Sequence, residues 1–431
     1  MADYDTIFAL SSGAPPAAIA IIRISGARSF AAVEAIAGRV PKPRKPSLAK
    51  LRSPDDGGLL DEALLLIFPG PDSATGEDLA ELHLHGGRAV IRAVEGVLAG
   101  MDGLRQAEAG EFTRRAFLNG RIDLNEADAL GDLLSAESEW QRRAAATMIG
   151  GKFAAAIERW REEVLRVSAA VEAVLDFSDE DDVESSNNIN ISNTCGVVIS
   201  EINGLLDQPP AEKLRDGLRV VLGGPPNSGK STLLNALVAR EAAIVSDIAG
   251  TTRDVIEVPV ALQGLPLVFI DTAGVGSSGG GDVIEAIGIK RAHNAFAGAD
   301  MILWLGPEGE GPEHDCLLEV DAKIDEAGHV AKSTGMPVSA KTDEGMSELA
   351  ENIVMRSKML LPPPDSFAVN RRQRAALKKT ANELQDAAVA EDMLIAAEQL
   401  RQARLALDAL TGRAHTEDML DTLFGRFCIG K

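Results

Sequence analysis

The segment from Gly224 to Ser231, with the sequence GPPNSGKS, places the tightest constraint on how this chain can fold. It matches the pattern GxxxxGK[ST], in which glycines let backbone N–H groups surround phosphates at the start of a helix. A strand-like run (RVVLG) precedes it and a helix-like run (STLLNALV) follows it, which is the context that such a loop requires. We therefore predict a strand, a phosphate-binding loop and a helix, with Lys230 near the β and γ phosphates and Ser231 on Mg²⁺.

Strand-like and helix-like runs alternate over residues 217–358, which predicts an α/β module with a mostly parallel sheet. Helical patterns lie on both sides of it, over residues 119–216 and 359–431. The simplest topology is a phosphate-loop module inserted into a helical-bundle domain. In the first helical half, apolar residues recur at spacings of four and three, which predicts one long helix with a buried stripe of Phe153, Ile157, Trp160, Val164, Val167, Val171 and Val174.

Residues 1–118 indicate a separate N-terminal α+β domain. Strands are expected over Ala17–Ile24 and Ala63–Phe68, separated by turns that contain Pro and Gly, and a helix is expected over Leu82–Leu98. The predicted fold class is therefore α/β multidomain, in line with a length of 431 residues, which suggests two to four domains.

The charge balance limits how the chain can bind nucleic acid. It has 43 Lys+Arg against 65 Asp+Glu, a formal charge of −22, which argues against broad non-specific binding to phosphates. A local basic patch or a basic partner stays compatible with it, and the run Arg371, Arg372, Arg374, Lys378 and Lys379 is either an RNA contact or a solvated helix face. Three scattered cysteines make no disulfide framework, and no apolar run approaches the length of a membrane span, so a cytoplasmic protein is expected.

Two further segments in the α/β module are typical of GTPases. The sequence DIAGTTRD at residues 247–254 is a candidate first switch, with Thr252 available to the metal ion. The sequence DTAG at residues 271–274 follows a strand-like run, and we expect Asp271 in the outer coordination shell of Mg²⁺ and the Gly274 amide near the γ-phosphate. Such loops order around the γ-phosphate and relax on hydrolysis.

Base recognition is expected from an Asn-Lys-x-Asp pattern followed by Ser-Ala-Lys. The chain has AKID at residues 322–325 and SAK at residues 339–341. Asp325 can accept hydrogen bonds from N1 and N2 of guanine, which adenine cannot offer. Ala322 replaces the usual Asn, so one polar contact with the base is missing, which affects affinity more than specificity.

A source of positive charge for catalysis is also needed, because phosphoryl transfer gains about 10³–10⁵ in rate from an arginine finger. No arginine finger is evident in the sequence. Asn227 in the phosphate loop and the GTT segment at residues 250–252 indicate a bound cation in that role.

Four sequence blocks together resemble the MnmE (TrmE) family of GTPases over essentially the whole chain. They are TGEDLAELHLHGG (75–87), GEFTRRAFLNGRIDLNEADAL (110–130), DIAGTTRD (247–254) and the terminal FCIGK (427–431). The resemblance implies a folate-binding and dimerising domain (1–118), a helical domain in two halves (119–216 and 359–431) and an inserted Ras-like G domain (217–358).

The resemblance also implies specific site residues. GTP hydrolysis would need Mg²⁺, held by Ser231 and Thr252, and K⁺, held by Asn227, Ser246, Ile248 and Thr251. Glu285 would orient the attacking water, and Lys230 would act with it in catalysis. The expected nucleotide contacts are Asn227, Ser228, Gly229, Lys230, Ser231, Thr232, Ser246, Thr252, Asp271, Thr272, Ala273, Gly274, Lys323, Asp325, Ser339, Ala340 and Lys341.

For a tetrahydrofolate ligand, in its 5-formyl or methylene form, the resemblance implies contacts with Arg23, Glu81, Arg121 and Lys431. Arg121 stands where the family commonly has Lys, and it keeps the charge. Cys428 would serve either as a nucleophile or in packing near this pocket. A metal site at His83 and His85 is disfavoured, because their spacing is that of a strand or turn.

The function implied by the resemblance is modification of the wobble uridine of certain tRNAs. A homodimer formed through the N-terminal domain would join an FAD-binding partner of the MnmG type in a heterotetramer. It would add a 5-carboxymethylaminomethyl-type group, using a one-carbon unit from tetrahydrofolate. The alternative is a regulatory GTPase switch, for example in ribosome assembly, that performs no covalent chemistry on RNA.

Overall fold

The computed structural model describes residues 5–176, 191–240, 256–272, 293–413, 417–425 and 427–430, and these form two compact units. The first unit contains Met1–Gly131 together with Asp408–Lys431, and the second contains Asp132–Leu407. The acidic run at residues 178–188 lies outside the described residues. None of the described helices is long and apolar enough to cross a bilayer.

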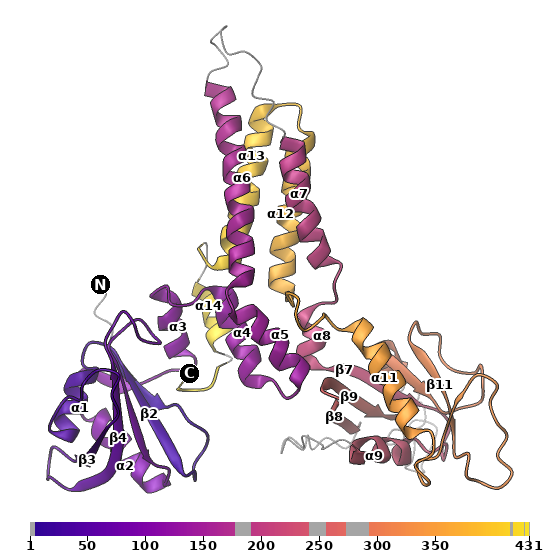
Figure 1. Cartoon of the computed structure of the whole chain (residues 1–431), viewed down its shortest axis with the longest axis horizontal. Coiled ribbons are helices and arrows are strands. Elements are labelled where there is room, and N and C mark those ends of the chain that lie inside the picture. The colour runs from indigo at the N-terminus through magenta and orange to yellow at the C-terminus, as the bar shows by residue number, and fades with distance from the viewer. Residues whose placement is uncertain are drawn as a thin grey trace, which may run out of the picture. The chain divides into compact units, whose positions relative to one another are not determined.

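The first unit is built on a six-stranded sheet with the order β3-β4-β5-β2-β1-β6. Only β1 and β6 pair in parallel, and the other neighbours are antiparallel. Apolar side chains of one sheet face pack against α1 and α2, which lie beside the strands in Figure 1. The strands are β1 (Thr6–Leu10), β2 (Ile19–Ser25), β3 (Ser47–Arg52), β4 (Leu59–Phe68), β5 (Leu79–His85) and β6 (Leu104–Gln106), and the helices are α1 (Ser29–Ala37) and α2 (Arg88–Ala99).

The expected helix over Leu82–Leu98 is wrong in its first part. Strand β5 occupies Leu79–His85, and α2 begins only at Arg88. Gly86 lies between the two elements. A Cβ there would lie 2.1 Å from the carbonyl oxygen of Ala17, so this close approach requires glycine. The alternation of buried Leu82 and Leu84 with partly exposed neighbours is the strand signal that this segment carries.

The C-terminal residues belong to this first unit. Helix α14 (Glu417–Phe424) packs with α3 (Glu111–Leu118) and α4 (Leu124–Ser135) around a small apolar cluster that includes Leu124, Phe424 and Phe427. An antiparallel bridge joins Ala109 to Ile429. The two ends of the sequence are therefore parts of one folded body.

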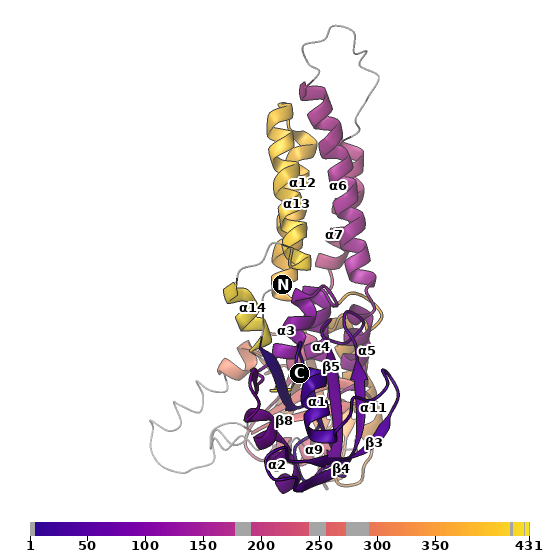
Figure 2. The same cartoon turned by 90° about the vertical axis from the view of Figure 1, so that its left-hand side faces the viewer.

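The helices of the second unit confirm the helical patterns on both sides of the α/β module. Helices α6, α7, α12 and α13 run side by side in Figure 1 and Figure 2, with α7 packed along α12. The predicted stripe of α6 is buried from Phe153 to Val171, but Val174 is 40% exposed near the helix end. The helices are α5 (Glu139–Ile149), α6 (Lys152–Asp176), α7 (Ile191–Leu206), α8 (Ala211–Asp216), α12 (Arg371–Val389) and α13 (Met393–Thr411).

The α/β module holds a second six-stranded sheet with the order β12-β11-β10-β7-β9-β8, in which only β8 is antiparallel to its neighbour. One face packs against α9 and α11 in a continuous apolar core. The elements are β7 (Leu218–Gly223), α9 (Lys230–Arg240), β8 (Ile256–Leu262), β9 (Leu265–Asp271), β10 (Met301–Trp304), β11 (Leu317–Ala322), β12 (Met336–Val338) and α11 (Met346–Leu360).

Two crossovers in this sheet differ from the expected alternation of strands and helices. Residues 305–316 join β10 to β11, residues 323–335 join β11 to β12, and neither described segment contains a helix. Parallel strands are usually connected through a helix that covers the sheet. Here Lys332 pairs with Glu319 at 2.7 Å and His329 lies 3.1 Å from a carboxylate oxygen of Asp321, so a loop covers polar side chains of β11.

Candidate functional site

The phosphate-loop residues lie where the sequence predicts them, between β7 and α9. Asn227 and Gly229 have positive φ values of 65° and 98°, and Gly224 has a φ of 143°. A Cβ at Gly224 would lie 2.9 Å from Ser228 Oγ and 3.0 Å from the Gly306 nitrogen. The turn therefore requires glycine at this position, where the backbone of another loop approaches closely.

Lys230 lies across the phosphate loop. Its Nζ donates to the carbonyl oxygens of Gly224 and Pro225, at 2.8 Å each. The residue is buried, and this burial lowers the pKa of the ammonium group, while the charge of Asp271 acts in the opposite direction. A cation held inside the loop is suited to contact an anion bound there. Ser228 Oγ is also buried, with no hydrogen-bond partner among the described residues, which leaves a hydroxyl free for a ligand.

Ser231 and Asp271 form the part of the site that fits a magnesium ion. Ser231 Oγ lies 2.5 Å from Asp271 Oδ2, and Asp271 is the last residue of β9, paired with Leu222 of β7. The next residue, Thr272, fixes this corner by donating from Oγ1 to the Leu222 carbonyl oxygen at 2.8 Å. A hydroxyl and a carboxylate are oxygen donors of the kind that Mg²⁺ prefers.

The candidate base-recognition residues lie at the same edge of the sheet, after β11 and β12. Ser339 Oγ donates to Asp325 Oδ1 at 2.7 Å, and this hydrogen bond lowers the pKa of the Asp325 carboxyl. Ser339 is fully buried and also accepts from the backbone N–H groups of Lys341 and Thr342. Asp325 is thus ionised and exposed, so its carboxylate can accept hydrogen bonds from a ligand.

Lys323 connects the base-recognition loop to the phosphate loop. A Cβ on Gly229 would lie 3.6 Å from Lys323 Cε, so the aliphatic part of this lysine passes beside the glycine. Its ammonium group pairs with Glu326 at 3.1 Å. Strands β7, β9, β11 and β12 are parallel, so their C-terminal ends lie at one edge of the sheet, where open α/β sheets bind ligands. The candidate residues at this edge are Lys230, Ser231, Asp271, Lys323, Asp325 and Ser339.

The remaining predicted nucleotide residues divide into two groups. Thr232 is exposed on α9, and Ala340 packs partly buried against the core of the α/β module. The others, Ser246, Thr252, Ala273 and Gly274, lie outside the described residues, as do the predicted potassium ligands Ile248 and Thr251 and the predicted catalytic residue Glu285.

In the first unit, Arg23 and Glu81 face each other across β2 and β5 on the sheet face opposite α1 and α2. Arg23 donates from Nε and from a terminal guanidinium nitrogen to Glu81 Oε1, at 3.2 and 2.9 Å. The guanidinium lies 5.8 Å from the centroid of the Phe112 ring. His83, which was not predicted as a site residue, lies 3.3 Å from the other oxygen of Glu81.

Arg121 and the C-terminal segment belong to the same unit. Arg121 lies 3.8 Å from a carboxylate oxygen of Asp72. Gly430 is held at the end of β1, because its carbonyl oxygen accepts from Ser11 Oγ at 2.7 Å. Lys431 is outside the described residues, and Cys428 is exposed. Ser11 and Asp72 were missed, since no local pattern marks contacts so distant in sequence.

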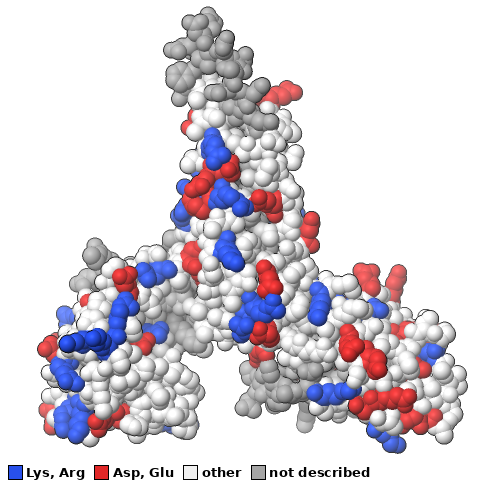
Figure 3. Space-filling model, viewed as in Figure 1, with Lys and Arg blue, Asp and Glu red and all other residues white. Residues whose placement is uncertain are grey.

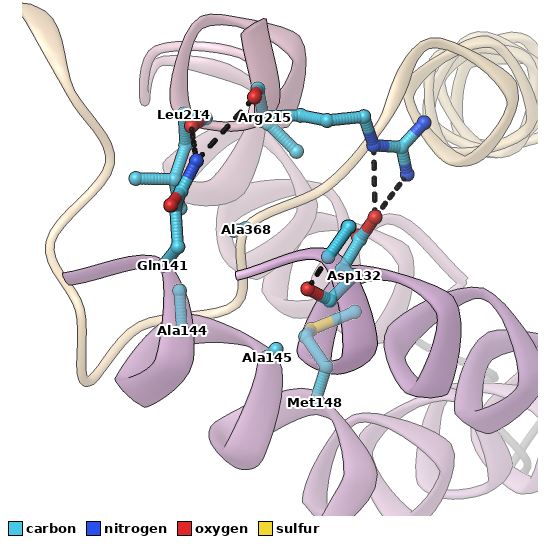
Figure 4. A pocket seen from close by; sticks show the side chains of 10 residues that line it. Asp132, Gln141, Ala144, Ala145, Met148, Leu214, Arg215 and Ala368 are labelled. Carbon is cyan, nitrogen blue, oxygen red and sulfur yellow. Dashed lines mark hydrogen bonds and ion pairs between the residues drawn. The ribbon is translucent and has the colours of Figure 1, made fainter. Parts of the chain in front are cut away.

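A small pocket of the second unit, shown in Figure 4, has no features of a nucleotide site. It lies among α4, α5 and α8, and Gln141 and Arg215 cross it to bond with Leu214 and Asp132. Its cavity volume is about 30 Å³, far below the roughly 300–1,000 Å³ of ligand pockets. The pocket is therefore a packing gap between helices.

Two family models and full-length relatives match nearly the whole chain. Residues 124–428 match the family model described as MnmE helical domain, and residues 6–121 match GTP-binding protein TrmE N-terminus. The tRNA modification GTPase MnmE of Erythrobacter litoralis is 56% identical over 428 residues, covering 99% of this chain and 100% of that protein. The protein of the same name from Novosphingobium aromaticivorans is 53% identical over 436 residues, with 99% and 100% covered. A crystal structure of an Aquifex aeolicus Era variant bound to GDP.AlF4⁻ is 26% identical over 38% of this chain and 66% of that chain, with a TM-score of 0.26.

Proposed function

Because this chain belongs to the MnmE family of tRNA modification GTPases, we propose that it hydrolyses GTP in a potassium-dependent cycle that serves modification of the wobble uridine. The GTP hydrolase activity in tRNA modification follows from the family. One observation carries the proposal: Lys230, the Ser231–Asp271 pair and the Asp325–Ser339 pair gather at one edge of a parallel sheet.

Each of these groups has a role in the proposed hydrolysis. Lys230 compensates negative charge on the β and γ phosphates, and its buried position keeps that charge close to them. Ser231 is the hydroxyl ligand for Mg²⁺, and Asp271 orients the ion's environment. Asp325 selects guanine by accepting from N1 and N2. Thr252 and Glu285 are proposed as the metal-binding threonine of the first switch and the residue that orients water.

Potassium is proposed to supply the positive charge that other GTPases take from an arginine. Asn227 would hold it with Ser246, Ile248 and Thr251. The side chain of Asn227 supports this role, because it is exposed on the phosphate loop and carries an amide oxygen suited to a hard cation.

The N-terminal unit is proposed to bind a tetrahydrofolate through Arg23, Glu81, Arg121 and Lys431. Support comes from the Arg23–Glu81 pair, which can exchange partners with a pterin, and from the docked tail that ends at Lys431. The same unit would form the homodimer, and an FAD-binding protein of the MnmG type would complete a cytoplasmic heterotetramer acting on tRNA. Cys428, exposed beside this tail, is available to the reaction or to the partner.

The first test is steady-state hydrolysis of GTP by the purified chain in KCl and in NaCl at equal ionic strength, with ATP as a control. We expect a large acceleration specific to potassium and no turnover of ATP. Equal rates in the two salts would show that Asn227 and its neighbours do not form a potassium site. Binding of 5-formyltetrahydrofolate, compared between the wild type and Arg23→Ala, tests the folate site separately.

A further inference from the structure

The segment that joins α1 to β3 and continues through β3 is a strongly basic stretch of this acidic chain. Between residues 39 and 52 it contains no Asp or Glu, and it carries six basic side chains, all exposed: Arg39, Lys42, Arg44, Lys45, Lys50 and Arg52. None of the six forms an ion pair with a carboxylate of the described residues. Figure 3 shows Lys and Arg side chains over α1 and β3 on this unit.

The backbone of this segment is fixed although its charges face solvent. Pro41 is buried, the Arg44 N–H donates to the Ile67 carbonyl oxygen at 2.9 Å, and the Lys45 N–H donates to the Lys42 carbonyl oxygen at 3.2 Å. The ammonium groups of Lys42 and Lys45 have no hydrogen-bond partner among the described residues. The ammonium groups of Lys42 and Lys45 are therefore exposed on an ordered loop, and binding through them requires little further ordering of the backbone.

The segment also borders the proposed folate site. The Arg44 guanidinium lies 5.7 Å from the Phe68 ring centroid and donates to the Asp72 carbonyl oxygen. The carboxylate of the same Asp72 lies 3.8 Å from Arg121. Phe68 stands on β4 two residues from Leu66, which pairs directly with Glu81, so both residues face the side of the sheet that carries Arg23.

The other basic run lies on α12. In both runs some arginines are used within the fold, as when Arg39 donates to the Leu48 carbonyl oxygen. Arg374 donates to the carbonyl oxygens of Leu206 and Gln208, and so caps the end of α7. Lys378 and Lys379 of that run are exposed. They offer a matched pair of lysines on a helix of the second unit.

We propose that the segment from Arg39 to Lys45 binds the phosphate backbone of the tRNA substrate and holds it beside the folate site. The inference rests on the proposed function, because it takes tRNA as the substrate and folate as the neighbouring ligand. Lysines contact phosphates as point charges, so this surface contributes affinity and position without reading sequence. A compact patch of this kind also reconciles a net charge of −22 with binding to a polyanion.

The test is binding of the full chain to an unmodified tRNA transcript with uridine at the wobble position, measured by fluorescence anisotropy over a range of KCl concentrations. Lys42→Ala/Lys45→Ala is compared with the wild type and with Lys378→Ala/Lys379→Ala, which removes the same charge. In the first variant we expect affinity about 10-fold lower near 0.15 M KCl, and a salt slope smaller by about 1.5–2. Lys42→Arg/Lys45→Arg should retain binding.

Three results would overturn the proposal. They are unchanged affinity in Lys42→Ala/Lys45→Ala, an equal loss in the α12 variant, and no tRNA binding by the wild type at low salt. If the first result is accompanied by loss of association with the FAD-binding partner, the surface is assigned to a protein partner. Potassium-stimulated GTP hydrolysis and folate binding are measured on the same preparations, so a failure of the proposed function is seen separately.

Discussion

The hydroxyl of Ser11 donates a hydrogen bond of 2.7 Å to the carbonyl oxygen of Gly430, although 419 positions separate the two residues in the sequence. Ser11 follows β1, and its N–H donates to the carbonyl oxygen of Ile21 on β2, the strand that carries Arg23. The contact therefore fixes the residue before Lys431 close to the strand that provides another proposed folate contact.

Gly430→Ala is expected to release the tail. Gly430 has a φ of 95°, and a Cβ there would lie 2.0 Å from the carbonyl oxygen of Leu10, so the docked conformation would be lost. We expect at least about a 10-fold loss of affinity for 5-formyltetrahydrofolate in isothermal titration, since losing one charged contact costs about 1.5–3 kcal/mol. Gly96→Ala on α2, where nothing lies within 4 Å, is the control. Unchanged folate affinity in Gly430→Ala would remove the tail from the site.

Asp325→Asn is expected to change the base preference from guanine to xanthine. The carboxylate accepts from N1 and N2 of guanine, whereas the amide of Asn can donate to the oxygen that xanthine has in place of the amino group. Ser339 can still donate to the oxygen of the introduced amide, so the loop keeps its anchor. Hydrolysis assays with GTP and XTP should show GTP affinity reduced about 10- to 100-fold and a gain for XTP. A variant that still prefers GTP would show that base selection lies elsewhere.

Ala322→Asn is expected to strengthen guanine binding. The position ends β11 immediately before Lys323, and restoring an amide side chain there adds the polar contact that the Ala lacks. A net gain of about 0.5–1.5 kcal/mol corresponds to an affinity for GDP about 2- to 10-fold higher. Fluorescent GDP binding measures it, and Ala322→Leu, which adds volume without polarity, separates hydrogen bonding from packing. No gain in Ala322→Asn would show that the site is adapted to Ala.

Most of the fold was predictable because its signals are local. Patterns within about 25 residues predict the phosphate loop, the strand before it, the strand that leads to Asp271, and the buried stripe of α6. The error at β5 came from reading Leu82 and Leu84 as part of a helix, although Gly86 interrupts the pattern and requires a turn.

Residues of the candidate nucleotide site could be predicted only where they belong to a sequence motif. Lys230, Ser231, Asp271 and Asp325 occupy one edge of the sheet because parallel strands end there. In contrast, the contact of Arg44 with Asp72 depends on how separate segments of the N-terminal unit pack, and no spacing in the sequence encodes it. The loop that covers β11 was missed for the same reason.

Glu111→Gln is expected to change the acid sensitivity of the first unit. Burial opposes ionisation of Glu111, but hydrogen bonds from Arg105, the Glu108 N–H and Arg115 outweigh it and lower its pKa to about 2. Since the pKa is depressed on folding, the ionised group stabilises the fold above about pH 4.5, and this contribution is lost as the pH falls toward about 2. The variant should be about 1–3 kcal/mol less stable at pH 7 and should lose less stability on acidification.

Hydrogen exchange of residues 104–118 at pH 7 and at acidic pH measures this effect within the first unit. Glu95→Gln provides the contrast, because burial raises the pKa of Glu95 and its charge therefore does not protect the fold at neutral pH. Equal acid sensitivity in the wild type and Glu111→Gln would show that the Arg105–Glu111–Arg115 cluster is not the source.

Lys332→Met is expected to destabilise the α/β module through the crossover that lacks a helix. The Lys332 ammonium group lies 2.7 Å from Glu319 and also donates to the Trp304 carbonyl oxygen at 3.3 Å, and both charged side chains are nearly buried. Removing one member leaves the other charge buried without its partner, which costs about 3–5 kcal/mol. Tryptophan fluorescence during urea unfolding reports the change, because Trp304 lies beside this pair. Lys358→Met, on the exposed side of α11, should have little effect.

The double variant Glu319→Leu/Lys332→Met tests whether the pair acts only through its charges. In that case the double variant should recover much of the stability that Lys332→Met loses. A double variant as unstable as Lys332→Met would show instead that the loop needs the hydrogen bond from Lys332 to Trp304.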